Sequence, residues 1–327
     1  MNYEMIDCID AGTPYCPCHL AETNECILCS QLQGKEFCDC KNWKGTCIYQ
    51  ELIWNNKESK AERETYKGVI VQKREIEKGL VEFVIQTNHE LCKELCSPGS
   101  YAFLRTPETT EYFDVPISIV ESDIENNRLL MIIDIEGIKT KKIYEKEEGD
   151  TLLVKGPFWN GVLGLKNVGA CKNKNVLLVA RGIGLAPMIP GLKKLYRQNN
   201  NISLIIDKGK YEDVFIKDFL HKYPCNVLEI ETLYKGNVTQ GFAEKLEAFI
   251  ENNKIGHIHI SGPDILILQI LKNINGRTKT SCCNNAKMCC GQGVCGACTT
   301  RFEGHVVKRL CKLQTDPEYI FEGRRNI

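Results

Sequence analysis

The sequence lacks several features that define common classes of protein. Its longest apolar run, residues 265–271, contains a glutamine and is far shorter than the ~18 apolar residues of a membrane-spanning helix. Lys plus Arg and Asp plus Glu balance at 42 each, so no net positive charge predicts nucleic-acid binding. The first residues carry neither the basic nor the apolar segment of a secretory signal. We therefore expect a cytoplasmic protein with no membrane or nucleic-acid partner.

Familiar catalytic motifs are also missing. The sequence contains no nucleophile elbow, HExxH motif or Walker motif. Of its six histidines only His257 and His259 are close together, on an expected strand with isoleucines between and after them. Histidines in such a place are more often core residues than metal ligands. The sequence therefore gives no sign of a histidine-based site.

Cysteine, in contrast, is abundant. The 19 cysteines are an odd number and follow no secretory signal, which favours a reducing compartment and metal binding over disulfides. Eight lie in residues 1–50 and seven in residues 281–327, with four between. The simplest interpretation is a metal-binding segment at each end of a cysteine-poor middle.

The middle of the chain has two kinds of pattern. Residues 67–168 contain short alternating apolar runs broken by turn residues, which predict an antiparallel β-barrel or sandwich. Residues 169–278 alternate apolar strands with helical stretches, which predicts a doubly wound α/β domain with a parallel sheet. Residues 51–66 are polar and suit a linker. We expect cysteine-rich modules at 1–50 and 279–327.

The C-terminal cysteines have the sharpest signature. Cys290, Cys295 and Cys298 follow the spacing C-x4-C-x2-C, with Cys311 farther on, as in plant-type [2Fe–2S] proteins. Glycines in this loop leave backbone amides free to approach the cluster sulfurs. Structural zinc is the alternative, but zinc ribbons usually use two separated C-x2-C pairs. The other cysteines of this end are expected to be bystanders: Cys282, Cys283 and Cys289.

The N-terminal cysteines predict a second metal centre. Seven thiols within 32 residues exceed what one zinc ion needs. Trp43 and Tyr49 could shield a cluster from water. We expect a [4Fe–4S] cluster, with structural zinc as the alternative, and the spacing does not select four ligands. The candidate ligands are Cys16, Cys18, Cys26, Cys29, Cys38, Cys40 and Cys47.

Two glycine-containing turns follow expected strands of the α/β domain. The first, beginning at Gly182, would let a pyrophosphate approach a helix N-terminus, although such a turn can also be merely structural. The second is Ser261-Gly262-Pro263. Because the carboxyl ends of parallel strands line the ligand crevice, we expect both turns on the cofactor edge.

Residues after the second α/β strand bear on the choice of nucleotide. Asp207 lies 23 residues after Gly184, where an acidic residue often binds the ribose 2′-hydroxyl of NAD. Lys208 and Lys210 follow and could instead bind the 2′-phosphate of NADP. The stretch could also be a solvated loop. Two lysines against one carboxylate favour NADP.

Further short motifs occur in a characteristic order: Pro98-Gly99, Pro116-Ile117-Ser118-Ile119, Gly137-Ile138-Lys139-Thr140 and Gly156-Pro157-Phe158-Trp159-Asn160-Gly161. With the two turns and the cysteine loop, they make the chain from residue 68 onward resemble the ferredoxin–NADP reductase superfamily. The resemblance is to the electron-transfer subunit of dihydroorotate dehydrogenase and to the small subunit of NADH-dependent ferredoxin:NADP oxidoreductases. The N-terminal module is similar to an extension of clostridial-type stand-alone ferredoxin–NAD(P) reductases.

The resemblance implies a FAD-binding barrel, an NAD(P) domain and a [2Fe–2S] loop that folds back on the flavin. The sequence differs from the family pattern at three positions: Val115 stands where the family has Arg, Arg181 where the family has Gly, and Ser261 where the family has Cys. Ser261 is expected to face the nicotinamide. The implied FAD residues are Pro116, Ile117, Ser118, Gly137, Thr140, Gly156 and Asn160. The implied NAD(P) residues are Arg181, Gly182, Gly184, Ala186, Pro187, Gly262 and Pro263.

Two functions are compatible with these features. One is a ferredoxin–NAD(P)⁺ oxidoreductase, in which the N-terminal cluster exchanges electrons with ferredoxin or a similar one-electron carrier. The other is an electron-transfer subunit that binds a catalytic partner subunit in a larger complex, such as a dihydroorotate dehydrogenase or a sulfide dehydrogenase-like, bifurcating enzyme. Residues 1–50 contain three Lys and seven acidic residues, whereas Lys308, Arg309 and Lys312 lie around Cys311 and could attract an acidic ferredoxin.

Overall fold

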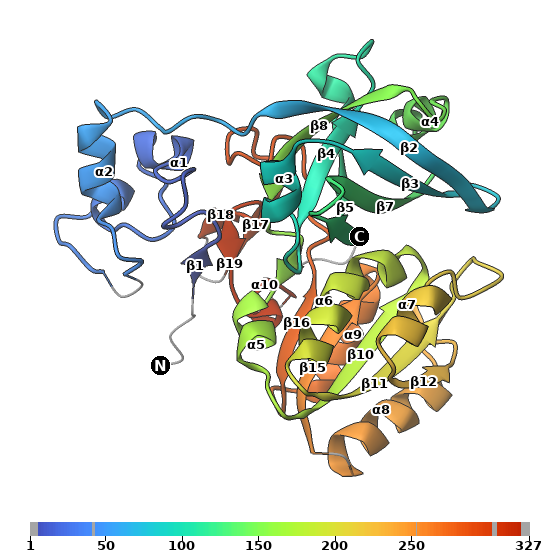
Figure 1. Ribbon diagram of the computed structural model, residues 1–327. Helices are drawn as coiled ribbons and strands as arrows, with labels where there is room; N and C mark the ends of the chain where they lie inside the picture. The colour runs from blue at the N-terminus through green and yellow to red at the C-terminus, as the bar shows by residue number, and fades with distance from the viewer. Residues whose placement is uncertain (1–5, 41–42, 253, 303–305, 322–327) are drawn as a thin grey trace. The chain divides into compact units, whose positions relative to one another are not determined.

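A computed structural model describes residues 6–40, 43–252, 254–302 and 306–321. The chain forms two compact units (Figure 1). The first, here called the cysteine unit, combines Met1–Thr65 with Ala286–Arg325. The second, the sheet unit, contains Tyr66–Asn285. The two cysteine-rich ends, expected as separate modules, thus belong to one unit.

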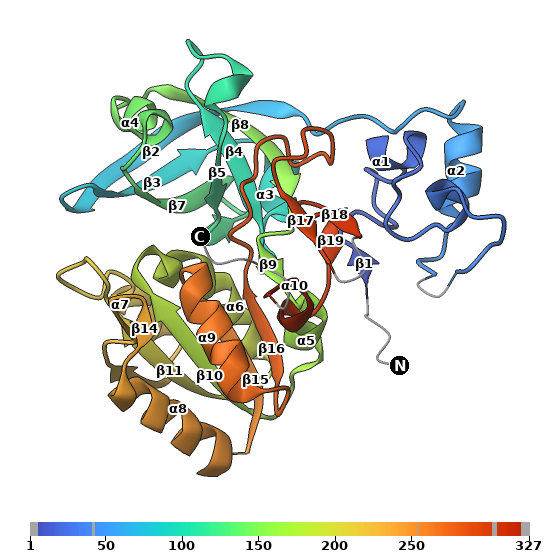
Figure 2. The same cartoon turned by 180° about the vertical axis from the view of Figure 1, so that it is seen from behind.

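The cysteine unit is built from short elements. Strand β1 pairs antiparallel with β19, and β17 pairs antiparallel with β18, which Figure 2 shows from behind. Its N-terminal half has a small hydrophobic core of Ala21, Cys26, Leu32 and Leu52. Cores this small usually need metals or other cross-links for stability. The elements are β1 (Asp7–Cys8), α1 (His19–Glu22), η1 (Gln31–Gln33), α2 (Ile48–Trp54), β17 (Thr299–Arg301), β18 (Val307–Arg309), β19 (Leu313–Gln314) and α10 (Pro317–Phe321).

The first half of the sheet unit is an antiparallel sheet with the strand order β5-β4-β8-β2-β3-β7-β6. The predicted closed barrel is wrong, because no ladder joins β5 to β6 in the described sheet. The two edge strands are consecutive, and the chain bends between them. The Ile119 amide donates a hydrogen bond to the Ser100 carbonyl on one side, and the Val120 amide donates to the Leu130 carbonyl on the other. The elements are β2 (Thr65–Glu77), β3 (Leu80–Gln86), α3 (His89–Glu94), β4 (Tyr101–Arg105), η2 (Glu111–Phe113), β5 (Val115–Ser118), β6 (Glu121–Asp123), β7 (Arg128–Asp134), α4 (Ile138–Tyr144) and β8 (Thr151–Phe158).

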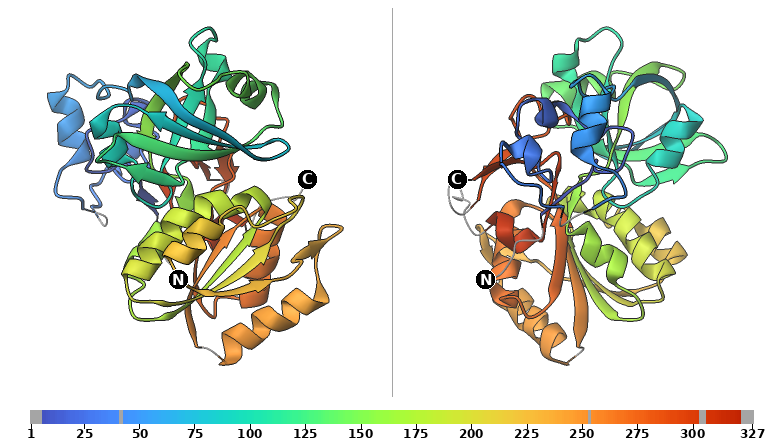
Figure 3. Two further views of the ribbon diagram at one scale, coloured as in Figure 1. Left: turned by 45° about the vertical axis from the view of Figure 1, so that its right-hand side comes forward. Right: turned by 90° about the vertical axis from the view of Figure 1, so that its left-hand side faces the viewer.

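The second half is the expected doubly wound sheet, with the order β12-β11-β10-β15-β16-β9. Its strands are parallel except β9, which pairs antiparallel with β16. Helices α6 and α9 cover opposite faces (Figure 3). The elements are β9 (Val162–Leu163), α5 (Leu165–Ala170), β10 (Asn175–Arg181), η3 (Gly182–Gly184), α6 (Leu185–Arg197), β11 (Asn201–Asp207), α7 (Lys217–Lys222), β12 (Asn226–Glu229), β13 (Leu233–Tyr234), β14 (Asn237–Val238), α8 (Gln240–Asn252), β15 (Ile255–Ser261), α9 (Asp264–Ile274) and β16 (Lys279–Cys283).

Packing explains why the central strands are apolar throughout. The five residues from Val176 to Ala180 in β10 are fully buried, because helices cover both faces of a doubly wound sheet. One hydrophobic cluster includes these strands together with Leu80 and Ile132 of the antiparallel sheet, so the two halves share a core. None of the helices in the described part of the chain is long and apolar enough to cross a membrane.

The strand histidines are buried in this core. His257 and His259 on β15 both contact the Ser281 hydroxyl, at 2.9 and 2.8 Å. Burial lowers the pKa of His257 to about 3 and that of His259 to about 4. Both rings are therefore neutral core residues at neutral pH.

We expect these histidines to make the sheet unit sensitive to mild acid. Their pKa values lie below the unfolded value of 6.5, so the unfolded chain takes up protons that the folded unit excludes. Between pH 7 and pH 5 the free energy of unfolding should fall by about 2 kcal/mol per histidine. In urea titrations at both pH values, H257Q/H259Q should show a much smaller fall. The exposed His89→Gln is the control, and an unchanged fall in the double variant would contradict the assignment.

Candidate functional site

The two glycine-containing turns meet at the carboxyl edge of the parallel sheet. Arg181 is in register with Asp207, and Ala180 with Ser261. A Cβ atom on Gly184 would lie 2.4 Å from the Ser261 carbonyl oxygen, so only glycine allows this close approach. The predicted cofactor edge is therefore assembled as the strand order requires.

The Ser261 side chain joins the two turns. It is fully buried, and its hydroxyl donates to the Gly184 carbonyl at 2.7 Å. Its expected place facing the nicotinamide stays a prediction. The buried Cys283 thiol lies beside the second turn and donates to the Gly262 carbonyl at 3.3 Å. Sequence reasoning expected Cys283 to be a bystander, because only the pairing of β15 with β16 reveals this position.

Asp207 makes several hydrogen bonds within the protein. Its carboxylate is ion-paired with Arg181 and accepts hydrogen bonds from the Thr232 amide and hydroxyl at 2.6 and 2.7 Å. The Gly209 amide donates to its other oxygen at 2.9 Å. Burial alone would raise the pKa of Asp207, but these donors and Arg181 hold it below its usual value. Asp207 thus organises the edge, and its role toward a ribose stays a prediction.

The neighbouring lysines differ in their partners. Lys210 forms ion pairs at 2.6 Å with both Asp134 and Glu136 of the antiparallel sheet, which raise its pKa. Lys208 donates to the Glu212 carbonyl at 3.2 Å. The carboxylates of Asp134 and Glu136 therefore offset the positive charge of Lys210, which the sequence suggested was available for the 2′-phosphate of NADP. Ala186 and Pro187 lie in the first turn of α6.

The residues implied for the flavin lie on three segments of the antiparallel sheet. Pro116, Ile117 and Ser118 form most of β5, which pairs with β4. Gly137 precedes α4, and the Thr140 hydroxyl donates to the Gly137 carbonyl at 3.1 Å.

The third segment, around Gly156 and Asn160, is fixed by close backbone contacts. The Asn160 carbonyl accepts from the Asn284 side chain at 2.8 Å. The Gly161 amide donates to the Gly99 carbonyl at 2.8 Å, and a Cβ on Gly161 would lie 2.7 Å from that oxygen. These motifs therefore bring β8 and the start of β4 together.

Two buried donors next to β4 and β5 fit a polar ligand. Ser100 Oγ and Arg105 Nε have no hydrogen-bond partner among the described residues. The Arg105 guanidinium also contacts Asp114 at 2.8 Å, next to Val115, where the family has its arginine. A guanidinium that is ion-paired with Asp114 but keeps one buried N–H without a partner can donate to a phosphate-bearing group such as FAD.

The four C-terminal motif cysteines form two pairs. Cys290 interacts with Cys295 and Cys298 with Cys311 through their thiols. The Cys311 thiol hydrogen bond lowers the pKa of Cys298 to about 6 although burial opposes it, which favours a thiolate. The Gln292 amide donates to Cys290 Sγ at 3.3 Å. This arrangement fits a [2Fe–2S] cluster, in which each iron takes two protein ligands.

Sequence reasoning missed a buried ionic cluster beside this loop. Lys312 and Asp10 are ion-paired, and Arg63 contacts the other Asp10 oxygen at 2.6 Å. All three side chains are buried. Burial would raise the pKa of Asp10, but Lys312 and Arg63 lower it below its usual value. The expectation that Lys312 attracts an acidic partner at the surface is therefore wrong, because its side chain is fully buried.

The N-terminal cysteines include an eighth thiol, Cys8 on β1. Burial raises the pKa of Cys16 to about 12 and also raises the pKa of Cys8 and Cys26, so metal binding there must release protons. Among the described residues, no three Cys, His, Asp or Glu side chains converge closely enough to bind one metal ion.

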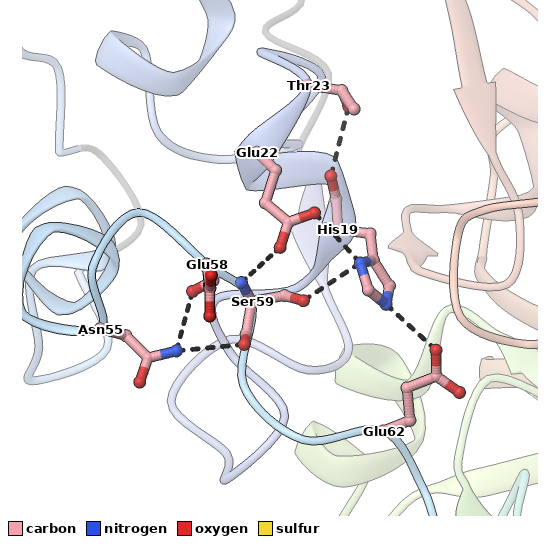
Figure 4. Close-up of polar contacts among 7 residues, drawn as sticks. All are labelled: His19, Glu22, Thr23, Asn55, Glu58, Ser59 and Glu62. Atoms are coloured by element: carbon pink, nitrogen blue, oxygen red, sulfur yellow. Dashed lines mark hydrogen bonds and ion pairs between the residues drawn. The ribbon is translucent and has the colours of Figure 1, made fainter.

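A polar cluster fixes the segment that follows α2 onto α1 (Figure 4). His19 lies between Glu22 and Glu62, at 3.1 and 3.3 Å, and contacts the Ser59 hydroxyl at 3.0 Å. The Asn55 side chain donates to the Ser59 carbonyl at 3.0 Å. Because His19 follows Cys18 directly, these contacts hold the cysteine in place rather than forming a metal site.

Comparisons with known proteins find relatives that are electron-transfer subunits. No protein-family profile matches it. It is 24% identical to the dihydroorotate dehydrogenase B (NAD(+)) electron transfer subunit of Clostridium perfringens, over 76% of this chain and 94% of the relative. The Listeria monocytogenes subunit is 28% identical, over 70% and 86%.

The fold agrees with these relatives. The structure of an NADH-dependent reduced ferredoxin–NADP oxidoreductase, studied for flavin-based electron bifurcation, matches with a TM-score of 0.60 and 23% identity, over 78% of this chain and 91% of that one. A ferredoxin reductase of carbazole 1,9a-dioxygenase matches with a TM-score of 0.50 and 13% identity, over 65% and 66%. These likenesses confirm the resemblance to the ferredoxin–NADP reductase superfamily, and to dihydroorotate dehydrogenase electron-transfer subunits within it.

Proposed function

We propose that the chain is an iron–sulfur flavoprotein oxidoreductase that transfers electrons between a nicotinamide nucleotide and ferredoxin or a similar one-electron carrier. One observation carries this proposal. The same chain combines a doubly wound sheet whose glycine turns meet at the carboxyl edge, as in nucleotide-binding domains, with cysteines spaced for iron–sulfur clusters. When bound, FAD would exchange an electron pair with the nucleotide, and the clusters would carry single electrons.

The side chains named above would bind and orient these groups. Gly182 leaves space for a pyrophosphate at the start of α6, whereas Gly184 lets this turn pack against Ser261. Arg181, which is ion-paired with Asp207, lies beside the turn. Ser118 and Thr140 would contact FAD. Arg105, whose Nε is buried without a partner, would supply the cation that the family pattern has at Val115.

The structure changes the argument for the nucleotide. The sequence favoured NADP because of Lys208 and Lys210, but Asp134 and Glu136 already engage Lys210. We therefore propose NAD as the preferred nucleotide. An ion-paired lysine binds a 2′-phosphate only after its carboxylate partners give way.

A second candidate is an electron-transfer subunit of a larger complex. The relatives named above are such subunits, and this chain covers 94% of the Clostridium perfringens protein. About a quarter of the chain lies outside that alignment, and an added cysteine-rich module is more useful where the partner is a soluble carrier. This favours the first candidate.

The two candidates predict different activities of the purified chain. Anaerobically prepared protein with FAD and clusters should oxidise NADH with an artificial dye in both cases. The first candidate also predicts NADH-linked turnover with ferredoxin, at least about tenfold above the rate without ferredoxin. Dye activity without ferredoxin turnover, together with a stoichiometric second chain after mild purification, would favour the subunit. Absence of NADH–dye activity would contradict both.

The C-terminal cluster assignment predicts a selective loss. Cys295→Ser should remove the electron paramagnetic resonance signal of the reduced [2Fe–2S] cluster while FAD stays bound, because a cluster iron loses a thiolate. Ferredoxin turnover should fall more than about tenfold. The exposed neighbour Cys289 provides the control, and Cys289→Ser should keep the signal. An unchanged spectrum in Cys295→Ser would contradict the ligand set.

The nucleotide proposal predicts a higher kcat/KM for NADH than for NADPH, by about tenfold. Replacing Glu136 by Gln should shift the ratio toward NADPH by about three- to fivefold, because an exposed ion pair contributes at most about 1 kcal/mol. Glu108→Gln is a matched control, since Glu108 pairs with Lys146 on the antiparallel sheet. A ratio unaffected by Glu136→Gln would show that Lys210 does not reach the 2′-phosphate.

A further inference from the structure

The N-terminal cysteines line two different cavities of the cysteine unit. The inner cavity has a volume of about 20 Å³ and the outer cavity one of about 280 Å³, and Ile48 lines both. We call the cysteines around them the inner and outer tetrads. The inner tetrad is Cys8, Cys16, Cys18 and Cys26. The outer tetrad is Cys29, Cys38, Cys40 and Cys47.

The hydrogen bonds of the thiols show how the two sets lie. In the outer tetrad Cys38 Sγ lies 3.5 Å from Cys40 Sγ. Cys26 of the inner tetrad accepts a hydrogen bond at its sulfur from the Cys29 amide at 3.4 Å, so the two sets adjoin at this point of the chain. Each set nevertheless lines its own cavity.

The sequence repeats one spacing across the two tetrads. The inner tetrad reads C-x7-C-x-C-x7-C, and the outer reads C-x8-C-x-C-x6-C. In both, a C-x-C pair lies at the centre, Cys16 with Cys18 and Cys38 with Cys40. One flanking cysteine precedes each pair and one follows it, at similar distances in the two tetrads. This pattern is independent of the cavities and divides the eight cysteines identically.

The surroundings of the tetrads differ. Leu20, Ala21 and Ile27 close the inner cavity, and Asp10 of the buried ionic cluster lines it. Leu20 also lies 3.1 Å from the position that a Cβ on Gly293 of the C-terminal loop would take. The inner tetrad thus adjoins the proposed [2Fe–2S] loop within the cysteine unit. In the outer tetrad Cys38 and Cys40 are exposed, whereas Cys29 and Cys47 are half-buried. Trp43 and Tyr49 beside them are exposed.

We propose that the N-terminal part of the chain holds two separate four-thiolate metal centres, one on each tetrad. This deepens the proposed function, on whose N-terminal cluster it rests, because it replaces one centre with an undefined ligand subset by two centres that use all eight cysteines. Four thiolates can hold an iron–sulfur cluster or a zinc ion. The outer cavity has the volume for a polynuclear cluster, whereas the inner one holds about one water molecule before metal binding.

Matched substitutions separate two centres from one. Cys18→Ser and Cys40→Ser change the second cysteine of each C-x-C pair, and Cys96→Ser changes an exposed thiol of the sheet unit as a control. Iron, zinc and acid-labile sulfide would be measured in anaerobically purified full-length protein. Each single variant should lose the metal of its own centre and keep that of the other, the double variant should lose all metal beyond the [2Fe–2S] cluster, and Cys96→Ser should lose none.

Alkylation of cysteines followed by peptide mass spectrometry gives a second readout. In Cys40→Ser, the remaining outer cysteines should become reactive while the inner tetrad stays protected. This variant decides the question even if Cys18→Ser fails to fold, because Cys40 is exposed. Loss of all N-terminal metal in Cys40→Ser, or reactivity of all eight cysteines in the wild type, would overturn the proposal. Two zinc ions would uphold the two centres but overturn the N-terminal electron relay of the proposed function, so the two failures are distinguishable.

Discussion

The cysteine unit depends on a buried contact between residues 302 positions apart, the ion pair of Lys312 with Asp10. Isolated charges are strongly unfavourable in a protein interior. Asp10 and Lys312 can therefore stay buried in the charged form only because they are paired with each other and, through Asp10, with Arg63. Removing one member of such a group typically costs about 3 to 5 kcal/mol. Because Lys312 follows Cys311 and Asp10 lines the inner cavity, the same contact fixes the C-terminal loop against the N-terminal cysteines.

The sequence predicted the features that follow from local pattern. Apolar strands alternating with helices indicated the parallel sheet, and its strand order then places Gly184 and Ser261 at one edge. The spacing of Cys290, Cys295, Cys298 and Cys311 predicted a tetrad that the structure resolves into two pairs. Each of these signals lies within a short stretch of chain or follows from topology.

Features that depend on distant partners could not be predicted in this way. Lys312 looked like a surface cation, because the sequence does not reveal its pairing with Asp10. Asp207 and Lys210 looked free to choose a nucleotide, yet both have partners from other segments of the chain. The bend at Ile119 and Val120, between the edge strands β5 and β6, is not marked by any turn residue in the sequence. The repeated cysteine spacing, in contrast, was visible in the sequence and became meaningful only with the cavities.

The pairing of β1 with β19 also has a consequence for biosynthesis. Cys8 and Asp10 are synthesised about 300 residues before their strand and charge partners, Leu313 and Lys312. At about 5 to 20 residues per second, a ribosome needs on the order of 15 to 60 s to bridge that interval. During this time β1 lacks its strand partner and the Asp10 carboxylate lacks Lys312, so both stay solvated until residues 312–314 are synthesised.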